Sequence, residues 1–154
     1  MKILLLVACS RSGADFFQSL LDGHSQILQF PGKLLTDNNF NEMLNLKDLN
    51  KIPEKFINLY PYFFNSKLNK IENHHRLGKK RNNFFKVNKE KFIKNFIKLS
   101  NNKRNLTKLN ILKNLHIAYD LTKDKKKQKA KIILIHTHLI SYTKNFIKFM
   151  NIKN

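Results

Sequence analysis

The chain has 154 residues, of which 42% are hydrophobic, and its 30 Lys and Arg residues against 10 Asp and Glu give a formal net charge of +20. This length allows one domain with a hydrophobic core but not two of ordinary size, and the apolar content excludes a wholly disordered chain. A single cysteine excludes a disulfide framework, so we expect a reducing compartment and a cytoplasmic location.

The positive charge has two interpretations. A surplus of this size attracts polyanions such as nucleic acid, acidic lipid or a phosphorylated small molecule. Most of the cations are lysines, however, whereas dedicated phosphate and base readers use the planar fork of arginine. Lys, Asn, Ile and Phe share A/T-rich codons, so a biased genome would give the same composition. We favour this second interpretation over a nucleic-acid surface.

The first element is the apolar run from Ile3 to Ala8, which precedes Cys9. Leu6-Val7-Ala8-Cys9 resembles the lipobox of bacterial lipoproteins, but the run is shorter than the roughly 7–15 residues of a signal sequence. A short run rich in Leu, Ile and Val favours a strand buried on both faces of a parallel sheet. Lys or Asn interrupts every later apolar run, so we expect no membrane segment.

A helix is expected from Ala14 to Asp22, followed by a second strand at Ile27–Phe30 that Pro31-Gly32 closes. The helix places four apolar residues at helical spacing: Phe16, Phe17, Leu20 and Leu21. Strand, turn, helix and strand within residues 1–32 are typical of the start of a βαβ fold. The sequence therefore predicts an α/β protein.

Residues 40–122 predict a basic, largely helical insert, in which Pro53 and Pro61 break the first part and residues 78–83 form a solvated loop. Two apolar stripes support the helices: Phe92, Ile93, Phe96 and Ile97, then Leu106, Leu109, Leu112 and Leu115. After a charged connector, a third strand is expected at Lys131–Ile135, with His136-Thr137-His138 at its carboxyl end. An amphipathic helix follows from Tyr142 to Met150, so the single domain spans residues 1–154 with about three strands.

Ligands of open α/β sheets bind beyond the carboxyl ends of the strands. At the first such end, Ser12, Gly13 and the following backbone N–H groups would open a helix that attracts phosphate. Arg11 adds a bidentate cation, whereas Asp15 is an unfavourable neighbour for an anion. The turn lacks the Walker A pattern. These residues alone leave phosphate binding and a plain strand–helix corner equally open.

Arg11-Ser12-Gly13, followed by small residues and an aromatic, resembles the 5′-phosphosulfate loop of sulfotransferases, and residues 20–26 resemble the segment that follows this loop in many bacterial members. The resemblance implies a P-loop-NTPase-like parallel sheet. It also implies that 3′-phosphoadenosine 5′-phosphosulfate (PAPS) is the co-substrate. The implied binding residues are Arg11, Ser12, Gly13, Ala14, Asp15 and Phe16. Ala14 and Asp15 replace the usual hydroxyl residues, which should weaken phosphate contacts.

His136-Thr137-His138-Leu139 resembles the Lys-Thr-His-Leu of cytosolic sulfotransferases. By that match His138 is the base that activates the acceptor, and His136 replaces the lysine that contacts the sulfonate. The acceptor would be a hydroxyl or amine of a small molecule, glycan or protein. No metal is expected, because the His, Cys and carboxylate residues show no ligand spacing along the sequence.

Sulfotransferases also hold the 3′-phosphate of the donor through an Arg and a Ser eight residues further on, and no arginine follows Arg104. We therefore expect a truncated sulfotransferase-like domain with weak or no activity alone, and with an unpaired sheet edge or an uncovered apolar face. A second polypeptide is one way to complete the fold. The alternative is a basic nucleic-acid-binding protein that uses the Lys/Asn-rich middle with its interleaved Phe side chains.

Overall fold

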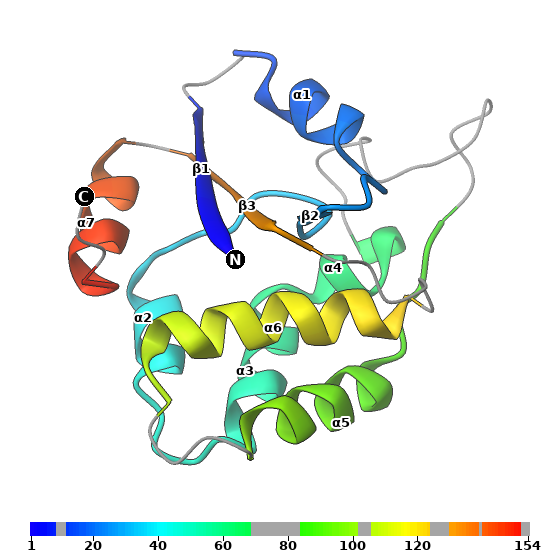
Figure 1. Cartoon of the computed structure of the whole chain (residues 1–154), viewed down its shortest axis with the longest axis vertical. Helices are drawn as coiled ribbons and strands as arrows, with labels where there is room; N and C mark the ends of the chain where they lie inside the picture. Colours follow the sequence, from blue (N-terminus) through cyan, green and yellow to red (C-terminus); the bar gives the residue numbers. More distant parts are fainter. Residues whose placement is uncertain (9–11, 69–83, 102–105, 124–129, 139, 152–154) are drawn as a thin grey trace.

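The computed structural model describes residues 1–8, 12–68, 84–101, 106–123, 130–138 and 140–151 (Figure 1). Arg11 and the predicted loop at residues 78–83 lie outside the described residues. The described elements form a mixed α/β structure, as predicted. Their strands build one parallel sheet, and most of their helices come from the predicted insert.

The sheet contains β1 (Lys2–Ala8), β3 (Ile132–His138) and β2 (Ile27–Leu28), in the order β1-β3-β2. Both outer strands run parallel to β3, and the register pairs Leu4 with Leu134 and Ala8 with His138. The strand from the end of the chain therefore lies between the two from its beginning. Consequently, the carboxyl ends of β1 and β3 lie side by side.

The prediction that the first strand is buried on both faces is wrong. Within the described residues β1 pairs only with β3, and Leu4 and Val7 remain exposed. The fully buried strand is β3, whose residues 133–137 are all buried. A central strand has a neighbour on each side, whereas an edge strand leaves one row of backbone groups and part of its side chains uncovered.

Helix α1 (Ala14–Leu20) begins where predicted but ends two residues earlier than expected. Its apolar stripe does not face the core: Phe16, Phe17 and Leu20 are exposed, and the residue that the helix buries is Gln18. Within the described chain, no element covers the apolar side of this helix. The residue that fixes its position is therefore polar.

The middle of the chain forms a group of helices on one side of the sheet (Figure 1). They are α2 (Asn38–Leu44), α3 (Lys51–Leu59), α4 (Pro61–Phe64), the short 3-10 helix η1 (Ser66–Leu68), α5 (Lys89–Ser100) and α6 (Lys108–Thr122). Capping side chains define three of the helix starts: Asp37, Asn88 and Thr107 each accept a hydrogen bond from a backbone N–H in the first turn. The described part of residues 40–122 is thus largely helical, as predicted.

The two prolines of the insert act differently. Pro61 starts α4 directly after α3 has ended, as a helix breaker should. Pro53 instead lies in the first turn of α3, where the backbone N–H has no partner within the helix. The predicted break at Pro53 is therefore wrong.

The hydrophobic core lies between this helical group and one face of β3. Ile133 and Ile135 of β3 pack there with aromatic residues of the insert: Phe40, Phe56, Phe63, Phe64, Phe92 and Phe96. Helix α7 (Ile140–Phe149) contributes Phe146 to the same core. Its Thr143 hydroxyl forms a hydrogen bond of 2.9 Å with the hydroxyl of Thr137 on β3. The alternate residues of β3, which include His136 and His138, face the other way.

Candidate functional site

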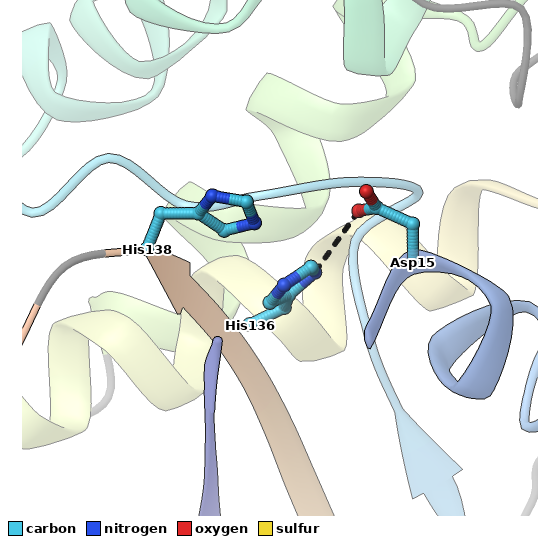
Figure 2. A group of neighbouring side chains, drawn as sticks. All are labelled: Asp15, His136 and His138. Atoms are coloured by element: carbon cyan, nitrogen blue, oxygen red, sulfur yellow. Dashed lines mark ion pairs between the residues drawn. The ribbon is translucent and has the colours of Figure 1, made fainter. Parts of the chain in front are cut away.

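The two segments that the sequence predicts as site residues come together at one end of the sheet. The first turn of α1 brings Asp15 beside His136 and His138, which occupy alternate positions at the carboxyl end of β3 (Figure 2). Asp15 Oδ1 lies 3.5 Å from His136 Nδ1, and the two imidazole rings are 5.0 Å apart. Residues more than a hundred positions apart in sequence thus form one polar cluster.

Gln18 holds this cluster together from α1. Its amide nitrogen donates to the carbonyl oxygens of Phe30 at 2.8 Å and Gly32 at 3.4 Å, and its Oε1 lies 2.8 Å from His136 Nδ1. The two donations fix which end of the amide faces the histidine. Since Oε1 can only accept a hydrogen bond, His136 Nδ1 carries the proton. In neutral His136 the lone pair is therefore on Nε2.

Asp15 is oriented by a second residue. Lys33 Nζ lies 3.6 Å from Oδ2 of Asp15, so each carboxylate oxygen faces a different nitrogen-bearing side chain. Lys33 comes from the extended segment that follows β2, and this segment is attached to β3 because the Leu34 N–H donates to the His136 carbonyl at 2.8 Å. The lysine reduces the unfavourable charge that Asp15 presents to an anion.

The two histidines differ in accessibility. His136 is buried, whereas His138 at the end of β3 is half-buried. His136 is also held by Gln18, which restricts its ring. His138 is therefore the more exposed of the two residues, although its Nε2 is itself buried.

The predicted phosphate loop is only partly described, because Arg11 lies outside the described residues. Gly13 precedes α1 in the left-handed conformation (φ 74°), and no described side chain caps this end of the helix. Ser12 and Gly13 are exposed, Ala14 is half-buried and Phe16 is exposed. The backbone N–H groups of the first turn have no partners within a helix, so they are donors for a ligand or water.

A cavity of about 360 Å³ lies against α1. Asp15 and Gln18 line it together with Gln29, Lys86 and Lys123, while Phe30 and Val87 supply apolar surface. His136 and His138 are not among its lining residues. The cavity is therefore adjacent to the cluster but separate from the histidines.

Sequence reasoning missed Gln18 and Lys33. The signal for Gln18 was weak, because it shares the gap between Phe17 and Leu20 with a second polar residue, Ser19. Lys33 carried no local signal, because its role depends on where the segment after β2 passes. The sequence analysis also missed that Asp15 lies beside the two histidines, although carboxylate and imidazole groups are common metal ligands.

Comparison with protein-family models, with curated proteins and with solved structures found no match to this chain. None of the helices in the described part of the chain is both long and apolar enough to cross a lipid bilayer. The sulfotransferase resemblance therefore has no support besides the two motifs. A functional proposal depends on these motifs and on the geometry of the site.

Proposed function

We propose that this chain is sulfotransferase-like: it binds the 5′-phosphosulfate of PAPS at the carboxyl end of its sheet and supports transfer of the sulfonate to a hydroxyl or amine acceptor. The supporting observation is the proximity of the first turn of α1 to the end of β3, which brings Asp15 within 3.5 Å of His136. Both motifs of the resemblance contribute to this one place, although they are far apart in sequence.

In this proposal the N-terminal end of α1 binds the sulfonate donor, PAPS. The N–H groups of its first turn and the guanidinium of Arg11 would bind the phosphosulfate. Gly13 leaves room, because among the described residues beyond its chain neighbours no atom lies within 4 Å of the position its Cβ would take. The sequence contains no arginine after Arg104 for the 3′-phosphate. We therefore expect weak binding, with a dissociation constant near the millimolar range.

His138 would be the general base. As the acceptor oxygen attacks sulfur, its proton moves to the imidazole of His138 while the bond from sulfur to the bridging oxygen breaks, releasing 3′-phosphoadenosine 5′-phosphate. The N–H groups of α1 would stabilise the charge that develops on the departing phosphate. His136 occupies the lysine position, but Gln18 restricts its ring, so its role is to position the site rather than to contact the sulfonate.

The nucleic-acid alternative is less well supported. Its stacking surface requires exposed aromatic side chains in the middle region, yet Phe63, Phe64, Phe92 and Phe96 are all fully buried. Phe84 is exposed, but a single ring in the described part of this region is not a stacking platform. The many lysines still attract polyanions, but this attraction is nonspecific and follows from their charge alone.

Calorimetric titration with 3′-phosphoadenosine 5′-phosphate in a chelator-containing buffer tests donor binding. We expect one weak site that Arg11→Ala abolishes and that Arg104→Ala, the matched loss of one positive charge, leaves in place. Binding to a mixed single-stranded oligonucleotide should instead respond to both substitutions and fall steeply with salt. Absence of heat at millimolar nucleotide, or equal losses in the two variants, would contradict the proposal.

Sulfonate transfer is tested separately with radiolabelled PAPS and a panel of phenol, sugar and amine acceptors. His138→Ala should abolish any transfer while retaining nucleotide binding, whereas His24→Ala, at an exposed position outside the cluster, should retain both. Transfer that persists in His138→Ala would show that this histidine is not the base.

A further inference from the structure

Asp15, His136 and His138 each offer one ligand atom, and these three atoms all lie within 4.8 Å of one another (Figure 2). The residues come from two elements, so their sequence spacing gave no metal motif. In the fold, however, they bring two imidazole rings and one carboxylate close together. This is a donor set that zinc uses in proteins.

The distances suit a small cation after a modest adjustment. Bonds of about 2.0–2.2 Å in a tetrahedral site place neighbouring ligand atoms roughly 3.4 Å apart. Starting from separations of at most 4.8 Å, the ligand atoms have to approach one another by up to about 1.4 Å. Asp15 Oδ1 also has to move from His136 Nδ1, which it faces here, towards Nε2, the lone-pair nitrogen. His136 and His138 are two residues apart on the same face of β3, so the backbone already holds two of the three ligands in position.

Neighbouring side chains orient two of these ligands as outer-shell residues do in metal sites. Gln18 accepts from His136 Nδ1, which leaves Nε2 as the lone-pair nitrogen of the neutral ring. Lys33 lies beside Oδ2 of Asp15, on the opposite oxygen from the one that faces His136. The His136 ring is thus restrained by Gln18 of α1, and the Asp15 carboxylate by Lys33 of the segment after β2.

We propose that Asp15, His136 and His138 form a binding site for one divalent transition-metal ion, with zinc as the best match. Imidazole ligands favour zinc and its neighbours over magnesium and calcium, which require oxygen-rich sites. Three protein ligands leave a fourth position for water or an anionic oxygen. The net charge of the chain and the nearby Lys33 lower the affinity for a cation, so we expect a dissociation constant in the micromolar range.

This site goes beyond the proposed transfer reaction and competes with it. A metal ion and the proton of an acceptor use the same lone pair of His138, so bound zinc would inhibit transfer. The metal site does not require that PAPS binds, and donor binding does not require the metal. Each proposal can therefore fail without the other.

The test is calorimetric titration of the full chain with Zn²⁺, after chelator treatment and without nucleotide, supported by the visible absorption of Co²⁺. We expect one equivalent to bind, Co²⁺ to give the intense bands of a four-coordinate site, and Mg²⁺ to give no heat. Asp15→Asn, His136→Gln and His138→Gln should each weaken Zn²⁺ binding more than tenfold, and Gln18→Ala about 10–100-fold.

His24→Gln is the matched control, since it removes an exposed histidine that neighbours α1 but not the cluster. Thermal melts in chelator show whether each variant is folded. If a histidine variant does not fold, Asp15→Asn tests the site instead, because Asp15 is half-buried and asparagine has nearly the same shape. One-to-one binding lost in the cluster variants and kept in the control supports the site. Absence of stoichiometric binding, or binding unchanged in Asp15→Asn, would overturn it.

Discussion

Gln18 and His136 are joined by a hydrogen bond of 2.8 Å across 118 positions of sequence, and both side chains are buried. The contact attaches α1 to the central strand of the sheet. It also brings Asp15, three residues earlier in the same helix, to the cluster at the end of β3. The position of the candidate site thus depends on this bridge together with the hydrogen bonds from Gln18 to the Phe30 and Gly32 carbonyls.

Replacing Gln18 by Leu should lower the free energy of unfolding by about 2–4 kcal/mol, because it removes the buried hydrogen bonds that the Gln18 amide forms with His136 Nδ1 and with the Phe30 carbonyl. Urea unfolding measures the change. Gln26→Ala, at an exposed position, is the control and should change stability by less than about 0.5 kcal/mol. Equal values for the two variants would mean that the bridge does not hold the helix.

Gly13→Ala should cost about 1–2 kcal/mol, since alanine is strained at a φ of 74° while none of the described residues beyond its chain neighbours obstructs its Cβ. Gly13→Asn should cost less, because asparagine tolerates the left-handed conformation. Denaturant midpoints of the two variants test this order. The reverse order would indicate that Gly13 is needed for space rather than for its backbone conformation.

His116 predicts a pH dependence of stability. Burial lowers its pKa from 6.5 to about 4, although the hydrogen bond from Nδ1 to the Leu112 carbonyl opposes this shift. As pH falls from 6.5 to 4, the unfolded chain takes up a proton that the folded chain excludes. The free energy of unfolding should therefore fall through this window, by about 3 kcal/mol in total, and be fully retained above it.

The measurement is urea unfolding at pH 7 and pH 4.5 for the natural chain and for His116→Leu. The loss between the two pH values should be smaller in His116→Leu, whereas His24→Gln at an exposed position should retain the full loss. The same pH dependence in all three proteins would rule out His116 as its source.

Phe63→Ala should destabilise the fold by about 3–5 kcal/mol, which is typical of large aromatic truncations in a core. The Phe63 ring stacks on both Phe30 and Tyr60, at centroid distances of 5.2 and 5.1 Å. Phe84→Ala is the matched control, because this ring is 40% exposed and should cost less than about 1 kcal/mol. Similar thermal shifts for the two variants would place Phe84 in the core as well.

Leu20→Glu should change stability by less than about 0.5 kcal/mol, since this side chain on α1 is 65% exposed. The equivalent change at Leu112, which is fully buried in α6, should prevent folding or cost several kcal/mol. Circular dichroism melts distinguish the two. A large loss in Leu20→Glu would show that the apolar side of α1 is covered in the folded protein.

The local elements could be predicted because each has a local cause. The apolar runs that became β1 and β3, the glycine turn before α1 and the stripes of α5 and α6 follow from periodicity and backbone preference. Phe92, Phe96, Leu112 and Leu115 are buried as those stripes predict. The second strand is shorter than expected, at Ile27–Leu28, because strand length depends on its partner.

Tertiary structure decided which elements became neighbours, and with them the site. Hydrophobic periodicity predicts that a segment has a buried face, but it does not show which segment covers that face or whether any does. The placement of β3 between β1 and β2 and the outward apolar side of α1 therefore had no signal in the sequence. The sequence indicated that both site segments follow strands of one sheet, but not that Asp15 and the two histidines would be neighbours. These arrangements result from pairing and packing between distant segments, which only the folded chain specifies.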